Sequence, residues 1–258
     1  MVKARNIGRK IPDTATVNGE TFKVVPHKFW IRYNREEWEP DLNRFFKKHA
    51  DSSKTVLDIG AWQGPSLFTA LSWKAKKIIA VEANTETCIL LETNITSNNL
   101  HDVVDLRQCC IADKTMGEVP FGPMDCHVEH SSVNGIGGRG YTVETISFTD
   151  FLGKLDLSDI NIVKIDVEGG ERLLTAGLKT LSDVPDTAIY LAMHPPFWPD
   201  KKSVAGDFMD VCKHFDMFDS KENPLTAERL WESMMSDEKT IYPNKTGRFF
   251  DIILKSKG

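Results

Sequence analysis

Carboxylate side chains stand in or at the ends of apolar runs in two stretches of this chain. In Thr55–Asn84, Asp58 lies in one short apolar run and Glu82 ends the next. Further along, the sequence KIDVEGGE places Asp166 and Glu168 at the end of another run, and alternation along a strand predicts that Lys164, Asp166 and Glu168 share one face. Charged side chains in such runs are rarely fully buried without a partner. We therefore expect site carboxylates that bind hydroxyl groups or move protons, with charge pairing inside the sheet as the alternative.

Glycines in the first stretch indicate what kind of ligand it binds. Gly60 provides the conformational freedom for a turn after the first run, and Gly64 lets a ligand or another backbone come close. Pro65 follows at the first position of a helix, where proline is well tolerated. A strand, a glycine turn, a helix and a second strand, with an acid at each carboxyl end, are typical of a nucleoside-binding unit.

Trp62 narrows the choice of nucleoside. The dinucleotide fingerprint requires glycines spaced G-x-G-x-x-G, so that a pyrophosphate can sit on the helix N-terminus. Trp62 takes the place of the middle glycine here, which leaves less room for a diphosphate. The turn favours a ligand with a small carboxylate at the helix end and a nucleoside beyond it, which is the shape of S-adenosylmethionine. Glu82, 24 positions after Asp58, then accepts hydrogen bonds from the ribose hydroxyls.

Three other interpretations stay open at this point. An NAD-dependent oxidoreductase is the alternative enzyme, and Trp62 speaks against it. A binding module that keeps the cofactor fold without the chemistry is the alternative outside the enzymes. A glycine turn that serves only the geometry of the fold is the third.

The elements that position these residues alternate along the chain. Strands that alternate with helices predict an α/β fold, with a doubly wound, mostly parallel sheet and helices on both faces. We expect residues 1–50 to form an N-terminal extension and helix packed on the core, and residues 51–258 to form a single domain. The predicted strands are 22–25, 56–59, 78–81, 103–111, 141–148, 161–167, 188–193 and 249–255, and the predicted helices begin at 40 and 65 or span 85–98, 149–155, 171–181, 206–215 and 227–235.

Composition excludes several classes of protein. A net charge of −5 over 258 residues argues against a nucleic-acid partner that is held by phosphate neutralisation. No apolar run approaches the ~20 residues needed to cross a bilayer, and no apolar segment of a signal peptide follows the first residues. The five cysteines form no CxxC pair, which favours reduced thiols and a cytoplasmic location. The oligomeric state is left open.

Two segments carry alternatives that the sequence leaves open. We expect residues 114–140 to form a lid or a hairpin excursion. Their Asp125, Cys126, His127 and His130 fit no standard zinc spacing, so we expect a solvated or substrate-facing loop. Near the N-terminus, Trp30, Tyr33 and Trp38 are expected to pack this segment onto the sheet, the alternative being that one of them covers a ligand.

These motifs together resemble a known family. VLDIGAWQG, AVEAN, the strand that ends at Ala112-Asp113, TISFTDFL and, most specifically, KIDVEGGE resemble FkbM-type S-adenosylmethionine-dependent methyltransferases over about residues 36–195. The resemblance implies a class I methyltransferase that acts on a hydroxyl of a sugar, glycan or related small molecule. The family often has an acid two residues before the histidine that corresponds to His194, where this chain has Ala192.

The resemblance also implies roles for individual residues. It places the methyl group that is transferred near Asp166, and it gives Glu39 a position that touches the cofactor. The cofactor-binding residues that it implies are Asp58, Gly60 and Gly64 at the methionine end, Glu82 at the ribose, Ala112 and Asp113 at the adenine, and, with no assigned part of the cofactor, Ala61 and Ala83.

Residues at strand ends are the candidates for activating the methyl acceptor. Asp166, Glu168 and His194 are the candidates for removing the proton of an acceptor hydroxyl, since all three lie on the ligand edge. Alternatively, Asp166 and His194, with another carboxylate, hold Mg²⁺ or Mn²⁺, which would lower the pKa of the acceptor. A histidine satisfied by the backbone is the structural alternative. Phe197 and Trp198 either stack on a sugar face or simply pack.

Overall fold

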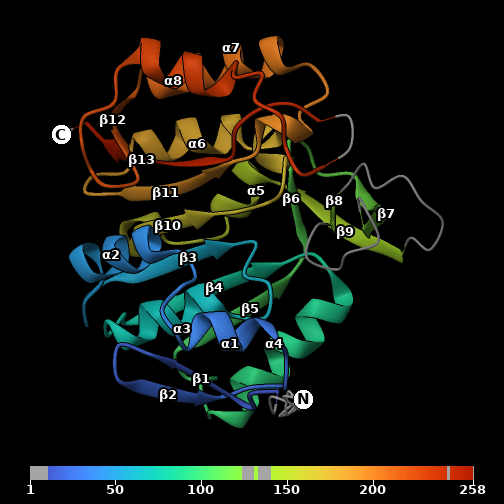
Figure 1. The fold of residues 1–258 in the computed structure, drawn as a ribbon, viewed down its shortest axis with the longest axis vertical. Helices are drawn as coiled ribbons and strands as arrows, with labels where there is room; N and C mark the ends of the chain where they lie inside the picture. The colour runs from blue at the N-terminus through green and yellow to red at the C-terminus, as the bar shows by residue number, and fades with distance from the viewer. Residues whose placement is uncertain (1–10, 124–130, 133–140, 243–244, 258) are drawn as a thin grey trace, which may run out of the picture.

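A seven-stranded sheet forms the centre of the computed structural model, which describes residues 11–123, 131–132, 141–242 and 245–257 (Figure 1). The strands are β3 (Thr55–Ile59), β4 (Lys77–Glu82), β5 (Val104–Gln108), β10 (Ile160–Ile165), β11 (Ala188–Met193), β12 (Phe215–Asp219) and β13 (Phe250–Ser256). Their order is β12-β13-β11-β10-β3-β4-β5, and β13 alone runs antiparallel to its neighbours. The predicted doubly wound, mostly parallel sheet is confirmed.

The strand order reverses between β3 and β10. From β3 the chain moves outward through β4 to β5, and it then returns to β10 beside β3 and moves outward to β11 on the other side. Ligands of open α/β sheets bind at the carboxyl ends of the strands at such a reversal. Gly60 directly follows β3 and Asp166 directly follows β10, so both lie at this point.

Helices cover both faces of the sheet (Figure 1). Because side chains alternate along a strand, Val56 packs into the core on one face and Leu57 into the core on the other. On the Val56 face lie the hairpin of β1 (Thr14–Val17) and β2 (Glu20–Lys23), and the helices α1 (Phe29–Tyr33), α2 (Pro40–His49), α3 (Pro65–Ser72) and α4 (Thr85–Ser97). On the Leu57 face lie α5 (Phe148–Leu152), α6 (Thr175–Ser182), α7 (Lys201–Cys212) and α8 (Ala227–Met234).

The strand predicted over 103–111 is wrong as a single element. It divides into β5 and β6 (Cys110–Ala112), and β6 leaves the central sheet. A second sheet has the order β6-β9-β7-β8, with β7 (Gly117–Pro123), β8 (Ser131–Ser132) and β9 (Tyr141–Ser147). The antiparallel pairing of β7 with β8 and β9 makes part of the predicted excursion a hairpin. Asp125, Cys126, His127 and His130 lie outside the described residues.

Two further boundaries differ from the prediction. The strand expected over 161–167 ends at Ile165, and the positive φ angles of Glu168 and Gly169, 49° and 93°, belong to a turn that begins after two further residues. A 3₁₀ turn over Gly170–Leu173 and α6 replace the helix predicted over 171–181. Toward the C-terminus, the helix predicted over 206–215 is α7, and β12 is a strand that the sequence prediction missed.

Aromatic residues near the N-terminus pack as expected. The side chains of Trp30 and Tyr33 are buried in the core on the Val56 face. The Tyr33 hydroxyl donates a hydrogen bond to the carbonyl oxygen of Pro65, at 3.0 Å, which ties α1 to α3. Trp38 is partly buried and its ring packs against Phe29. The packing interpretation is confirmed for Trp30 and Tyr33.

Two negative findings concern the described part of the chain. None of its helices is long and apolar enough to cross a bilayer. Its four cysteines, Cys88, Cys109, Cys110 and Cys212, are free thiols, and burial raises the pKa of each. These thiols are therefore weak nucleophiles at neutral pH.

Glu222 ties α2 to the edge of the sheet. Its carboxylate accepts hydrogen bonds from Lys48 and Lys255 and lies 3.3 Å from the Nε2 atom of His49. Burial alone would raise the pKa of Glu222, but these partners lower it from 4.5 to about 2. Because this pKa is lower in the folded state, the stabilisation is complete above pH 4.5 and is lost as the pH falls toward 2.

We therefore expect Glu222→Gln to lower the free energy of unfolding at pH 7 by about 1–2 kcal/mol. The difference from the wild type should shrink as the pH falls toward 2, because the wild-type carboxylate then becomes protonated. Urea titrations across this pH range measure both quantities. Glu232→Gln, which changes an exposed acid on α8, is the control and should shift stability by less than about 0.5 kcal/mol. Equal stabilities of the two variants would contradict this role of Glu222.

Candidate functional site

The glycine turn after β3 lies directly against Asp166. Gly60 has a φ of 80°, and its N–H donates to the carbonyl oxygen of Val81. A Cβ atom on Gly60 would lie 1.8 Å from the carbonyl oxygen of Asp166, so only glycine fits. The backbone N–H of Asp166 donates to the carbonyl oxygen of Ile59, at 3.0 Å. The turn and Asp166 are therefore held in contact by the backbone itself.

The other predicted residues of the turn are packed closely. Ala61 is buried, and its N–H also donates to the carbonyl oxygen of Val81. Gly64 has a φ of 101°, and an added Cβ would lie 2.9 Å from the Cδ1 atom of Leu91. The space that Gly64 leaves open is thus filled by α4, which gives this glycine a packing role.

Glu82 ends β4 beside the turn and is buried. Its two carboxylate oxygens accept hydrogen bonds from the N–H groups of Trp62, at 2.8 Å, and Asn84, at 2.7 Å. Burial raises the pKa of Glu82 to about 7, while these two N–H groups act in the opposite direction. The carboxylate is fixed in one orientation, and each oxygen keeps a second lone pair for a hydroxyl group.

The residues predicted to hold the adenine and ribose lie along the neighbouring elements. Ala83 packs against Cys110 and Val143, where β6 meets β9. Ala112 is buried at the end of β6, and Asp113 follows it on the exposed surface. The structure thus places all three beside the carboxyl ends of β4 and β6.

Lys164 is a buried cation behind the turn. Its Nζ atom donates to the carbonyl oxygen of Gly60, at 2.7 Å, and lies 3.3 Å from the Oδ1 atom of Asp58 and 3.8 Å from the Oδ2 atom of Asp166. Burial would lower the pKa of Lys164, but the charges of Asp58 and Asp166 outweigh it and raise the pKa. The predicted alternative, in which Lys164 and Asp166 pair with charges inside the sheet, therefore holds for Lys164, whose nearer carboxylate is that of Asp58. The Oδ1 atom of Asp166 is buried and accepts no hydrogen bond from the described residues.

His194 brings the three predicted catalytic residues together. Its Nε2 atom lies 3.6 Å from the Oδ1 atom of Asp166 and 3.4 Å from the Oε2 atom of Glu168. One atom from each of the three side chains lies within 4.8 Å of the others. We call Asp166, Glu168 and His194 the edge cluster, because it lies at the carboxyl edge of β10 and β11.

Glu171 orients the edge cluster, a role that sequence reasoning missed. It is fully buried, and its Oε1 atom lies 2.7 Å from the Nδ1 atom of His194. It also accepts hydrogen bonds from the N–H of Gly169, at 2.9 Å, and from the indole N–H of Trp198, at 3.1 Å. His194 is therefore satisfied by a side chain and not by the backbone. The sequence signal was KIDVEGGE itself, in which Glu171 looks like an ordinary acid in the first turn of a helix.

The carboxylates around His194 hold its proton. Burial would lower the pKa of the imidazole, but Glu171 and Glu168 outweigh burial and raise it to about 10. With these neighbours alone, His194 is an imidazolium at neutral pH. A carboxylate of the edge cluster is then a better proton acceptor than the imidazole.

Two further acids face the edge cluster from other elements. Glu39 precedes α2 with a left-handed φ of 40°, and burial, followed by the charge of Asp166, raises its pKa well above the usual value. Asp251 in β13 lies opposite Ala192 in β11, and burial, together with the charge of Asp166, raises its pKa to about 6. Asp251 thus places an acid beside the position where the resemblance leaves one missing. Sequence reasoning missed it, although an acid inside the apolar run FFDIILK was the available signal.

Aromatic rings also lie next to His194. The rings of Phe197 and Phe249 lie 6.2 Å and 5.5 Å from the imidazole, centre to centre, and 5.3 Å from each other. Tyr242 lies 5.1 Å from Phe197, and 39% of Phe249 is exposed. Trp198 instead is buried and stacks on Phe208. Of the two predicted sugar-stacking residues, Trp198 has a packing role, while Phe197 is one of the rings next to His194.

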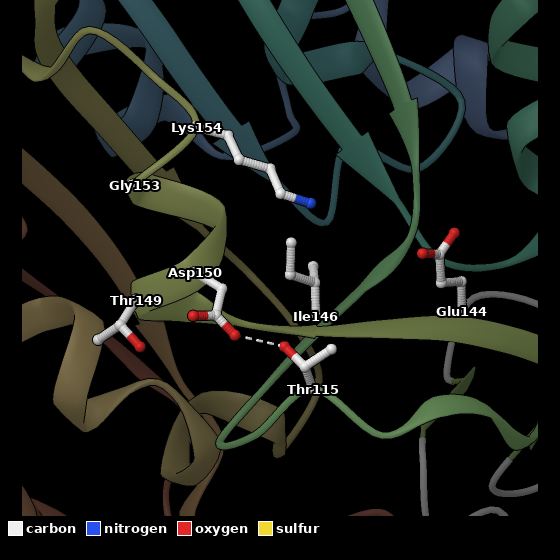
Figure 2. A pocket seen from close by; sticks show the side chains of 7 residues that line it. All are labelled: Thr115, Glu144, Ile146, Thr149, Asp150, Gly153 and Lys154. Carbon is white, nitrogen blue, oxygen red and sulfur yellow. Dashed lines mark hydrogen bonds between the residues drawn. The ribbon is translucent and has the colours of Figure 1, made fainter.

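An open pocket of about 440 Å³ lies against β9 and α5, apart from the edge cluster (Figure 2). Figure 2 shows Lys154 and Glu144 on either side of Ile146, and the carboxylate of Asp150 accepting a hydrogen bond from Thr115. None of the predicted site residues lines it. Its lining consists of Thr115, Glu144, Ile146, Thr149, Asp150, Gly153 and Lys154.

Solved structures of methyltransferases resemble this chain at low sequence identity. Precorrin-6y C5,15-methyltransferase from Geobacter metallireducens is 13% identical, with a TM-score of 0.47 over 86% of this chain and 88% of that chain. The O-methyltransferase from Bacillus cereus in complex with SAH is 12% identical, with a TM-score of 0.47 over 83% and 79%. Methyltransferase FkbM from Methylobacillus flagellatus is 11% identical, with a TM-score of 0.47 over 82% of this chain and 50% of that chain.

The family is shown by the sequence itself. A comparison with curated proteins finds no significant match. The model of the methyltransferase FkbM domain matches residues 52–211, which is more than half of the 258 residues and includes the glycine turn and the edge cluster. This chain therefore belongs to the FkbM family of S-adenosylmethionine-dependent methyltransferases.

Proposed function

We propose that this chain transfers a methyl group from S-adenosylmethionine to a hydroxyl of a sugar, glycan or related small molecule. One observation carries the proposal: the edge cluster lies where the strand order reverses, with Asp166 in backbone contact with the glycine turn. When bound, S-adenosylmethionine supplies an electrophilic methyl group on a positively charged sulfur. The chain must then bind, orient and deprotonate an acceptor.

The residues at the turn fit this cofactor. Glu82 is a buried carboxylate whose orientation is fixed by two backbone N–H groups, which suits the recognition of two adjacent ribose hydroxyls. Gly60 leaves no room for a side chain between the turn and Asp166, and Trp62 occupies the position that a diphosphate would require to be glycine. The carboxylates of this edge also suit a ligand with a cationic sulfur.

Methyl transfer needs an acceptor oxygen that has lost its proton. As the oxygen bonds to the methyl carbon, the carbon–sulfur bond breaks and its electron pair stays on sulfur. The proposed acceptor of the hydroxyl proton is Asp166, whose Oδ1 atom is buried and accepts no hydrogen bond from the described residues. Proton removal of this kind contributes about 10²–10⁴ in rate, and alignment of the reactants up to ~7–11 kcal/mol.

The surroundings of the edge cluster favour a ring-shaped, hydroxylated acceptor. The rings of Phe197 and Phe249 lie beside the imidazole of His194, and the carboxylates of Asp166 and Glu168 lie near its Nε2 atom. A sugar has an apolar ring face and hydroxyl groups at its rim, which matches both surfaces. This match supports the carbohydrate class of acceptor.

Glu82→Gln is expected to weaken S-adenosylmethionine binding at least 10-fold, because the amide replaces a carboxylate oxygen that accepts from the ribose with a donor. Titration calorimetry on the full chain measures the dissociation constant. Glu92→Gln, which changes an exposed acid on α4, is the matched control and should bind like the wild type. Unchanged binding by folded Glu82→Gln would contradict the ribose role.

Two experiments separate the proposed function from its alternatives. Calorimetry with NAD should show no binding, and tight NAD binding without S-adenosylmethionine binding would favour an oxidoreductase. A screen of glycans and hydroxylated small molecules, with labelled S-adenosylmethionine as methyl donor, should then find an acceptor. Cofactor binding with no transfer to any member of the screen would favour a binding module.

A further inference from the structure

We propose that the edge cluster binds one divalent metal ion, through the Oδ1 atom of Asp166, the Oε2 atom of Glu168 and the Nε2 atom of His194. Donor atoms of the three residues lie within 4.8 Å of one another, and Nε2 lies 3.6 Å and 3.4 Å from the two carboxylate oxygens. Two ligands of one metal ion at 2.0–2.2 Å stand about 3–4 Å apart. Small side-chain rotations are therefore enough to bring all three atoms to one ion.

The imidazole of His194 is held in the way that metal-binding histidines are held. Histidines that bind metals almost always donate their other ring N–H to a carboxylate or carbonyl, which fixes the ring and leaves one nitrogen facing the ion. Glu171 takes this part, 2.7 Å from the Nδ1 atom of His194. Glu171 is itself held by Gly169 and Trp198, so the ring cannot turn away from Asp166 and Glu168.

Asp166 offers an oxygen that faces His194 and has no hydrogen-bond partner among the described residues. Its two oxygens have different neighbours, since Oδ2 faces Lys164 at 3.8 Å and Oδ1 faces His194. Oδ1 is buried and accepts no hydrogen bond from the described residues. Burying such an oxygen is costly unless a cation or a donor satisfies it. A metal ion between Oδ1 and Nε2 would do so, and it would take the place of the proton that Nε2 otherwise holds.

The charges around the edge cluster also favour the binding of a cation. The carboxylate of Glu171 contacts His194 in addition to the cluster's own two acids, while Lys164 is the neighbouring lysine and already pairs with Asp58. The acids therefore outnumber the cations here. A divalent ion would reduce this excess of negative charge.

The cluster is open on one side. The side chains of Asp166 and Glu168 are 23% and 22% exposed, whereas that of Glu171 is fully buried. Three protein ligands leave further positions of a six-coordinate ion for water or for an acceptor oxygen. A metal-bound hydroxyl loses its proton more readily, so with the ion in place Asp166 would serve as its ligand and the acceptor proton would pass to water. This role, though not the binding itself, rests on the proposed function.

The ligand types favour Mn²⁺ over Mg²⁺. Mg²⁺ prefers oxygen ligands and keeps most of its waters, while an imidazole nitrogen suits later divalent metals. Two carboxylates and one imidazole are a mixed set that suits Mn²⁺. Mn²⁺ also has an electron paramagnetic resonance signal, so its binding can be followed without any methyl acceptor.

The test is Mn²⁺ titration of the chelator-treated full chain, followed by electron paramagnetic resonance. We expect one bound Mn²⁺ per chain, and at least 10-fold weaker binding in Asp166→Asn and in Glu168→Gln. Glu171→Gln should weaken binding about 10- to 100-fold through the orientation of His194. Glu144→Gln, which changes an exposed acid of the separate pocket, should bind like the wild type. Thermal melting identifies any variant that does not fold. If Asp166→Asn is unstable, Glu168→Gln, which changes a residue in the turn after β10, still tests the site.

Two results would overturn the site. One is a folded wild-type chain that binds no Mn²⁺ at millimolar concentration, and the other is folded Asp166→Asn and Glu168→Gln that bind it as well as the wild type does. Failure of the metal site is distinguishable from failure of the proposed function. Methyl transfer that persists in chelator, without Mn²⁺ binding, contradicts the metal site alone. Mn²⁺ binding lost in both variants supports the metal site whether or not an acceptor is methylated.

Discussion

Gly60→Ala is expected to lower the free energy of unfolding by more than about 3 kcal/mol. The added Cβ would lie 1.8 Å from the carbonyl oxygen of Asp166, and the φ of 80° at this position disfavours any side chain. The backbone of Asp166 cannot move away from the added Cβ without a large cost, because its N–H group donates a hydrogen bond to Ile59 at the end of β3. Urea titration followed by circular dichroism measures the loss.

A second glycine substitution is the matched control for this prediction. Gly206 lies inside α7, and an added Cβ there meets nothing within 4 Å. Gly206→Ala should therefore raise the free energy of unfolding by about 0.5–1 kcal/mol, through helix propensity alone. If Gly60→Ala were as stable as the wild type, the close contact between the turn and Asp166 would be wrong.

Asp166→Asn is expected to reduce kcat/KM for methyl transfer by about 10²–10⁴. The amide keeps the size of the side chain but has no negative charge and is not basic, so it cannot take up the acceptor proton as we propose for Asp166. Kinetics with any acceptor that the screen identifies measure the effect, and thermal melting verifies that the variant folds.

The control for Asp166 lies at the other end of the same segment. Asp159 is exposed and directly precedes β10, whereas Asp166 directly follows it. Asp159→Asn should leave both stability and kinetics unchanged. If folded Asp166→Asn kept the wild-type rate on every acceptor, the catalytic role of Asp166 would be wrong.

Local sequence patterns predicted the turn and the central sheet well. The runs at β3, β4 and β11 are short, apolar and bounded by turn residues, so their identity does not depend on distant partners. Pro65 and the glycines on either side of Trp62 mark the start of α3 in the same local way. KIDVEGGE led to Asp166 and Glu168 because acids after an apolar strand are unusual.

Asp166 and Glu168 of KIDVEGGE meet at the predicted edge of the sheet, but strand alternation is not what brings them together. Alternation along a strand predicted that Lys164, Asp166 and Glu168 share one face. The strand ends at Ile165, and Glu168 reaches His194 because its φ is positive. Sequence periodicity cannot predict such a turn.

The residues that the sequence analysis missed depend on pairings between distant segments. Asp251 faces the edge cluster because β13 pairs antiparallel with β11, and its register places Asp251 opposite Ala192. Glu171 acts through His194, 23 residues later in the chain. The departure of β6 into a second sheet follows from its pairing with β9. No local pattern encodes these contacts.

The most direct test of the account is the fate of a ¹³C-labelled methyl group of S-adenosylmethionine, followed by nuclear magnetic resonance of the acceptor. The account predicts that the label appears on a hydroxyl oxygen of a sugar or related ring, and that this signal is lost in Asp166→Asn and kept in Asp159→Asn. Label on a nitrogen or carbon atom, or an equal signal from folded Asp166→Asn, would contradict it.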